Sequence, residues 1–222
     1  MAKEIKDRIV EVLDRTFRVL DKCYEHNDEK SGKANKQASG SRIIFPCYSK
    51  TYRNGERRIS EQELRFVFIE QFNQYCEETG WDAYYSVETP TEWEYRFSGE
   101  EKPHKTDSDE GQSAMVDVCV HDNQGERICL LEFKAGNPEP FCYIKDLVKL
   151  TEEGKLGFFV QLLKSQNKAT WESIKGKISV DLKGNNYVCH TIGPQKYHGT
   201  QYISNSEIII DGWERRKISI DN

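Results

Sequence analysis

The sequence lacks any long hydrophobic run. Nowhere in its 222 residues is there a stretch near the roughly 18 consecutive apolar residues that a membrane-spanning helix requires. Residues 1–13 alternate charged with aliphatic side chains, whereas the central part of a signal peptide is apolar throughout. We therefore expect a protein that is neither inserted in a membrane nor secreted.

Paired cysteines are absent as well. The seven cysteines are odd in number, widely spread and never spaced as Cys-x-x-Cys. This pattern is not that of a disulfide framework or of a zinc knuckle. It is the pattern expected of reduced thiols in a cytoplasmic protein.

The sequence also lacks an excess of basic over acidic residues, since its formal net charge is −5. Proteins that coat nucleic acid non-specifically depend on many Lys and Arg contacts to phosphates, so any nucleic-acid site here must be local. Core-forming residues, by contrast, are plentiful: 36% of the chain is hydrophobic, with 10 Phe, 11 Tyr and 4 Trp. At this length, one decorated globular domain is expected.

Two regions are predicted along the chain. Residues 3–26 carry aliphatic and aromatic side chains at three- and four-residue steps among charged ones, which predicts an amphipathic helix. Residues 27–41 are almost entirely polar or small, so we expect a flexible linker that completes an N-terminal region over residues 1–41. Residues 42–222 then form the main α/β domain.

Within that domain, periodicity predicts the order helix, three strands, helix, strand. The first helix covers residues 60–78; a capping box, Ser60-x-x-Glu63, opens it and Gly80 ends it. A second helix ends at Gly154, and a third is expected near residues 169–178. Strands are expected at residues 81–87, 115–121, 128–135, 156–163, 187–192 and 207–211, with a polar loop at 100–112. The predicted fold class is α/β, with a mixed central sheet flanked by helices.

Three residues on the predicted hairpin carry the chemistry. If Gln124-Gly125 is a two-residue turn, the numbers of paired residues sum to 249, which places Asp117 opposite Glu132. Opposite residues of an antiparallel pair share a face with Cβ atoms roughly 4.5–5.5 Å apart, and Lys134 lies on that face two positions further on. Two acids and one ammonium group are therefore expected to converge.

Two like charges facing each other on a sheet destabilise it unless a cation lies between them. Mg²⁺ meets this need, with Mn²⁺ as a substitute, because it takes hard oxygen ligands and keeps positions for water and a substrate phosphate. The metal would polarise a phosphoryl oxygen and acidify a bound water, and Lys134 would orient that water. The competing interpretation is that these three charged residues lie on a solvated face of the hairpin, where Lys134 forms an ion pair with one of the two acids. The other residues of that face are apolar, which argues against it; they are Met115, Cys119, Ile128 and Leu130.

These residues resemble the PD-(D/E)xK nuclease superfamily, the restriction-endonuclease-like proteins, over residues 58–165. The family core is helix, three strands, helix, strand, with an Asp ending the second strand and Glu-x-Lys on the third. The resemblance implies that Asp117 and Glu132 bind the metal and that Lys134 is the catalytic lysine. It further implies an additional acid, Glu61, whose Glu-x-Glu-Leu pattern is similar to that of archaeal junction resolvases. One departure is Val116, which stands where the family name has proline. The implied activity is magnesium-dependent hydrolysis of phosphodiester bonds, with DNA as the favoured substrate.

Several assignments stay open at this point. Glu61 is equally well explained as an acid that the helix dipole favours in a first turn. Arg53, Arg57 and Arg58 precede that helix and are candidates for phosphate contacts, or else form a solvated basic loop. The alternative function is a catalytically idle module of the same fold that binds nucleic acid or protein. A further alternative is an interaction domain whose N-terminal helix recruits a partner, and a homodimer is one possible assembly.

Overall fold

The computed structural model describes residues 2–30, 32–97, 103–107, 111–164, 167–178, 184–192 and 199–203, together with the backbone of 204, 207–212 and 214–219. The helices are α1 (Ala2–His26), α2 (Lys36–Ser39), α3 (Glu61–Thr79), α4 (Pro140–Glu152) and α5 (Lys168–Ile178), with a short 3-10 helix, η1 (Arg53–Gly55). The strands are β1 (Tyr84–Arg96), β2 (His104–Thr106), β3 (Gln112–His121), β4 (Arg127–Ala135), β5 (Leu156–Leu163), β6 (Asn186–Thr191), β7 (Gly199–Ser204), β8 (Glu207–Gly212) and β9 (Glu214–Ser219).

All of these strands join one mixed sheet, in the order β2-β1-β3-β4-β5-β6-β7-β8-β9. Neighbours are antiparallel from β2 to β4 and again from β6 to β9, whereas β4, β5 and β6 run parallel. The helices α4 and α5 provide the crossovers between the parallel strands, as such connections require. The predicted α/β class with a mixed sheet is confirmed.

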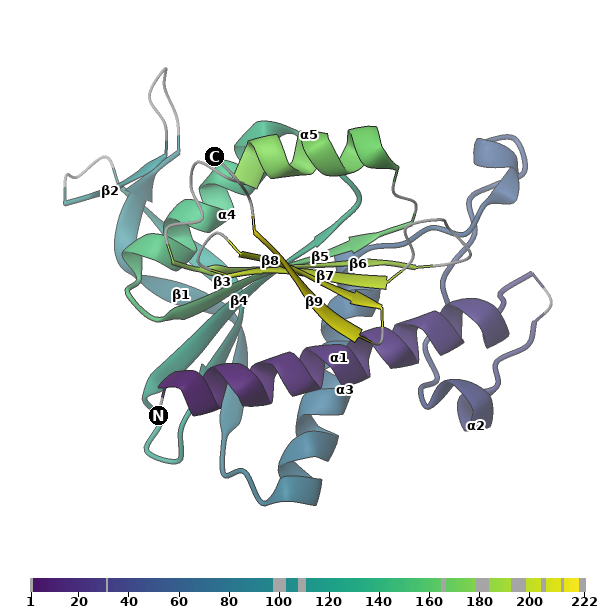
Figure 1. The fold of residues 1–222 in the computed structure, drawn as a ribbon, viewed down its shortest axis with the longest axis horizontal. Coiled ribbons are helices and arrows are strands. Elements are labelled where there is room, and N and C mark those ends of the chain that lie inside the picture. The colour runs from purple at the N-terminus through teal and green to yellow at the C-terminus, as the bar shows by residue number, and fades with distance from the viewer. Residues whose placement is uncertain are drawn as a thin grey trace.

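Helices cover both faces of the sheet (Figure 1). α1 and α3 lie on one face, and α4 and α5 lie on the other. The core under the first pair includes the apolar stripe of α1, for example Ile9, Leu13 and Phe17, and the core under the second is centred on Leu147 and Phe159. Within the described ranges, no helix is both long and apolar enough to cross a bilayer.

The helix α3 is the one predicted over residues 60–78, but its cap differs from the expectation. Ser60 is the N-cap residue, yet its hydroxyl donates to the Glu63 carboxylate and accepts no hydrogen bond from the helix backbone. Glu63 is buried and lies 3.5 Å from Arg58. The predicted capping box is therefore wrong, because Glu63 turns toward two side chains instead of the free backbone N–H groups. At the other end, Gly80 caps the helix with a φ of 68°, as predicted.

The β3–β4 hairpin keeps the predicted register but makes a different turn. The chain reverses over residues 123–125, with Gly125 in the left-handed region at φ 85°, so the loop has three residues and not two. A bulge after Val120 absorbs the additional residue. Val118 therefore still pairs with Leu131, whose numbers give the predicted sum.

Residues 27–41, predicted as a flexible linker, contain α2 and three buried polar residues, Asn27, Ser39 and Ser41. The Asn27 side-chain amide is buried and donates to the Ser39 hydroxyl and to the carbonyls of Ser41 and Ile43. Its side-chain oxygen accepts from the backbone N–H of Asn35. Hydrogen bonds from a single asparagine thus hold a segment that has few apolar side chains.

Candidate active site

The candidate site lies where β3 and β4 separate. The ladder between these strands ends at Val118 and Leu131, although β3 continues to pair with β1, and β4 with β5. Asp117 bridges the opening, because its Oδ2 accepts a 2.7 Å hydrogen bond from the backbone N–H of Phe133. Asp117 and Glu132 are therefore not directly paired across the two strands as predicted, and the hydrogen bond to Phe133 takes the place of that pairing. We call this opening between β3 and β4 the fork.

An arginine of α3 faces Asp117. Arg65 Nη1 lies 3.5 Å from Asp117 Oδ1 and also forms an ion pair with Glu88. Glu88 lies on β1 with a φ of 46°, which is uncommon for a residue other than glycine. Asp117 is thus held from the strand side by the Phe133 N–H and neutralised from the helix side by Arg65.

Glu132 is the most deeply buried acid at the fork, with 2% of its side chain exposed. Lys149 of α4 forms an ion pair with Oε1, yet this buried oxygen accepts no well-aligned hydrogen bond. Burial, together with the neighbouring Asp146, raises the pKa of Glu132 well above its usual range, and the Lys149 ammonium only partly opposes the rise. The surroundings of Glu132 at the fork therefore disfavour its ionised form, although Lys149 is ion-paired with it.

Asp146, also on α4, connects the two lysines of the site. Its Oδ2 lies 2.7 Å from Lys134 Nζ, and its Oδ1 lies 2.9 Å from Lys149 Nζ. Burial alone would lower the pKa of Lys134, but the carboxylates of Asp146 and Glu61 outweigh burial and the pKa is raised. Lys134 is therefore a fixed ammonium and not a neutral amine.

Glu61 reaches the same cluster from the first turn of α3. Its Oε1 lies 3.8 Å from Lys134 Nζ, and 44% of its side chain is exposed, so it forms the open side of the site. Partial burial raises the pKa of Glu61, and the nearby Lys134 ammonium only partly opposes this rise. The structure thus brings together Asp117, Glu132, Lys134 and Glu61, and it does so as an ion-paired cluster.

Two members of this cluster were not predicted from the sequence, namely Asp146 and Lys149. Both lie on α4, whose buried stripe contains Tyr143, Leu147 and Leu150. At about 100° per residue, Asp146 lies about 65° from the middle of that stripe, whereas Lys149 lies about 125° from it and so projects away from the apolar residues. Helical periodicity therefore gave no signal that could have identified Lys149 as buried.

The cluster offers the oxygen ligands that a hard divalent cation prefers. The buried Glu132 Oε1, which lacks an aligned hydrogen bond, is the observation that fits such an ion. In the observed geometry, however, Asp117 faces Arg65 and Glu132 faces Lys149. Among the residues that the structure describes, no three Asp, Glu, His or Cys side chains are placed to hold one ion. The predicted ligands are chemically suitable for Mg²⁺ and are engaged in ion pairs.

A basic cleft of about 440 Å³ opens beside the cluster. It brings together the three arginines predicted to contact phosphates, and none of the described residues that line it is acidic. One wall is formed by Ala135 and Gly136, which follow Lys134 directly along the chain. The cations that line this cleft are Arg53, Arg57, Arg58 and Lys164.

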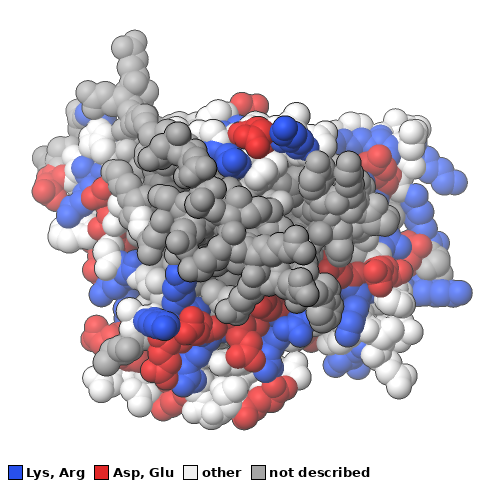
Figure 2. Space-filling view, viewed as in Figure 1, with Lys and Arg blue, Asp and Glu red and all other residues white. Residues whose placement is uncertain are grey.

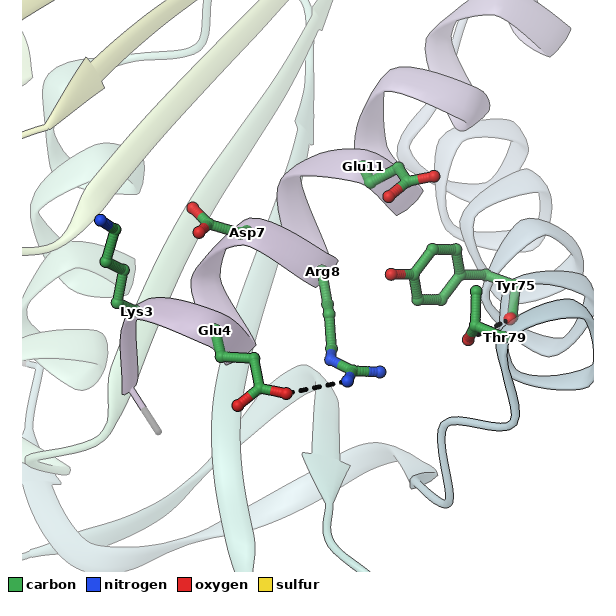
Figure 3. A pocket seen from close by; sticks show the side chains of 7 residues that line it. All are labelled: Lys3, Glu4, Asp7, Arg8, Glu11, Tyr75 and Thr79. Atoms are coloured by element: carbon green, nitrogen blue, oxygen red, sulfur yellow. Dashed lines mark hydrogen bonds and ion pairs between the residues drawn. The ribbon is translucent and has the colours of Figure 1, made fainter.

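A second hollow, of about 530 Å³, lies between the N-terminal part of α1 and the C-terminal part of α3 (Figure 3). Its lining mixes signs: Glu4 and Arg8 are paired at 2.8 Å, and Asp7, Lys3 and Glu11 lie around them. The described part of the face in Figure 2 likewise shows acidic and basic side chains interspersed. The charged residues that line the basic cleft are all cations, although Arg57, Arg58 and Lys164 are each ion-paired with an acid outside the lining.

Comparison with known proteins gives no match. No family model, no curated protein and no solved structure matches this chain. Its function is therefore inferred from the geometry and chemistry of the site.

Proposed function

We propose that this protein is a magnesium-dependent nuclease that hydrolyses phosphodiester bonds, with DNA as the favoured substrate and the cytoplasm as its location. The observation that carries the proposal is the convergence of Asp117, Glu132, Lys134 and Glu61 at the fork, beside a cleft lined with cations. The element order α3-β1-β3-β4-α4-β5, with the short β2 inserted after β1, supports the restriction-endonuclease-like core that the sequence resembles.

In this proposal Asp117 and Glu132 hold the metal, for which Mn²⁺ can substitute, and Glu61 completes the ligand set from the open side. When bound, the metal supplies polarisation of a phosphoryl oxygen and a more acidic water. Lys134 contributes a permanent positive charge that Asp146 keeps in place. That charge stabilises the negative charge that grows on the phosphate in the transition state. As an ammonium, Lys134 donates hydrogen bonds and does not act as the base.

The basic cleft is the proposed binding site for the backbone of the substrate. Arginines are suited to this task because the guanidinium group donates two parallel hydrogen bonds to a phosphate. The strand that carries Lys134 continues into the cleft wall at Ala135, so a phosphodiester held by Arg57 and Arg58 would lie next to the cluster. Binding through such contacts should weaken as the salt concentration rises.

A nuclease assay on four variants tests the proposal. Single- and double-stranded DNA and RNA oligonucleotides are incubated with and without Mg²⁺. The wild type and the control Glu126→Ala, an exposed acid of the same hairpin, should cleave only with Mg²⁺. Asp117→Ala, Glu132→Ala and Lys134→Ala should each lose about a hundredfold or more in rate. Equal cleavage by all variants, or no cleavage by any protein, would contradict the proposal.

One observation favours a second candidate, the catalytically idle module. Arg65, Lys149 and Lys134 already pair with the proposed metal ligands, as they would in a cluster that serves only to hold α3 and α4 against the sheet. The two candidates differ in their response to a cation that binds only the folded protein. Mg²⁺ should raise the melting temperature of a nuclease. Nucleic-acid binding with a melting temperature that ignores Mg²⁺ would favour the idle module.

A further inference from the structure

Lys149 occupies the centre of the buried charges at the fork. Its ammonium lies 2.8 Å from the Met115 carbonyl oxygen and 2.9 Å from Asp146 Oδ1, and it forms an ion pair with Glu132 Oε1. The Met115 carbonyl accepts a hydrogen bond from this ammonium, and the two carboxylates supply the negative charge that balances it. Only 5% of the side chain is exposed, so the protein supplies the surroundings that water would otherwise provide.

We propose that Lys149 is the resident cation of this site and that a divalent metal ion binds in competition with it. The inference rests on the proposed nuclease function and adds a residue of α4 that sets the metal affinity. An ion bound through Glu132 Oε1, the buried oxygen that lacks an aligned hydrogen bond, approaches the atom that Lys149 now faces. Two cations that share one carboxylate repel each other, and the repulsion is stronger where burial excludes water. Metal binding therefore requires the Lys149 ammonium to withdraw from Glu132.

The contacts of the two lysines distinguish their roles. The ion pairs of Lys134 are with Asp146 at 2.7 Å and Glu61 at 3.8 Å, whereas Lys149 is the lysine paired with Glu132. Lys149 also keeps the Met115 carbonyl and Asp146 as partners when it leaves Glu132. Withdrawal is thus a small movement between partners that are already present. Without metal, the same ammonium holds the Glu132 carboxylate in the fork.

The test measures the dissociation constant for Mg²⁺ alone, by isothermal titration calorimetry on the full chain in alkaline buffer. Lys149→Met removes the competing charge at similar length and should tighten Mg²⁺ binding by about tenfold or more relative to wild type. Lys149→Arg keeps the charge and should not tighten it. The matched control is Lys145→Met on the same helix, whose ammonium lies 4.8 Å from the Phe97 ring centre; its affinity should equal that of wild type.

A second variant covers the case in which the methionine protein does not fold. Lys149→Gln is also uncharged, and its amide can still donate to the Met115 carbonyl. Mg²⁺ binding that is equal to or weaker than that of wild type in these folded, uncharged variants would overturn the inference and leave the nuclease proposal standing. Failure of wild type and all variants to bind Mg²⁺ would overturn both.

Discussion

Replacing Asp146 with alanine should lower the free energy of unfolding by about 3 kcal/mol. The Asp146 side chain is 6% exposed and lies 2.7 Å from Lys134 Nζ and 2.9 Å from Lys149 Nζ. Removing one partner of a buried ion pair costs about 3–5 kcal/mol, and the lower figure applies because Lys134 keeps Glu61 and Lys149 keeps Glu132. For a chain of this length, the melting temperature should fall by roughly 6–12 °C.

The loss should be constant from neutral to mildly alkaline pH. The pKa values of Lys134 and Lys149 are both raised in the folded protein, because carboxylates that include Asp146 outweigh the effect of burial. A raised lysine pKa stabilises the fold fully below the unfolded value of about 10.4, and the contribution disappears as the pH rises through the folded value. The stability difference between wild type and Asp146→Ala should therefore begin to shrink only above about pH 10.

Urea unfolding followed by circular dichroism measures this difference at each pH. The control is Glu152→Ala, an exposed acid on the same helix, which should change stability by less than about 0.5 kcal/mol. Asp146→Asn keeps the side-chain volume and separates the loss of charge from the loss of packing. An Asp146→Ala protein no less stable than Glu152→Ala would refute the reasoning that Asp146 holds the two lysines.

Three further changes test other parts of the molecule. Glu132→Gln removes an acid whose pKa is raised by burial in the folded protein. Because ionising that acid destabilises the fold increasingly as the pH rises above about 4.3, the melting temperature of the variant, relative to that of wild type, should increase from about pH 4 to 7. A relative melting temperature that decreases over this range would contradict the prediction. Asp117→Ala leaves the Phe133 N–H without its acceptor and should lower the free energy of unfolding in urea by about 1–3 kcal/mol. Asp117→Asn should recover most of this free energy. An equal loss in both variants would disprove the role of this hydrogen bond. Asn27→Ala should speed amide hydrogen exchange over residues 33–43, and unchanged protection there would show that other contacts hold the segment.

Apolar periodicity was sufficient to predict the elements that bury one regular face. The helix predicted at 60–78 is α3, Glu61–Thr79, and the strand predicted at 156–163 is β5. Periodicity was insufficient for β2, three residues within the predicted polar loop that pair with the end of β1. It also failed for the second half of β1, which continues past Pro90 by means of a register shift between Pro90 and Glu94. Short or irregular strands depend on pairing partners that are distant in the sequence.

The hairpin register was predicted although the turn was not. A three-residue loop ending at Gly125 replaces the expected two-residue turn, and the bulge after Val120 restores the pairing. Both faces of the paired segments are buried, and successive side chains enter different cores: Val118 and Leu131 pack under α1 and α3, whereas Cys119 and Leu130 pack under α4 and α5. This division sets the register, because a slip of one residue would turn each buried side chain to the wrong face. The length of the turn can therefore differ from the prediction while Val118 and Leu131 remain paired.

Local geometry predicted the candidate site only where its residues are close in sequence, and the distant Glu61 was named from the family resemblance. Asp117, Glu132 and Lys134 belong to one hairpin, so local geometry relates them to each other. Asp146 and Lys149 come from a helix that crosses over the fork after a separate connection. Helical periodicity places Lys149 away from the apolar stripe of this helix, and it does not indicate which strand lies beneath either residue. Packing between elements determines that position.

The buried charges at the fork favour a chemical role over a purely structural one. Glu132, Asp146 and Lys149 have side chains that are at most 6% exposed, and groups so buried lose hydration energy that their mutual attraction often fails to recover. Well-packed apolar residues in place of a buried ion pair are often neutral or stabilising, so stability alone would favour residues like the neighbouring Leu147. The chain instead places charges where β3 and β4 separate and where a basic cleft begins. Hydrolysis of a phosphodiester needs fixed charges of this kind, because groups already in position stabilise the transition state without reorganising during the reaction.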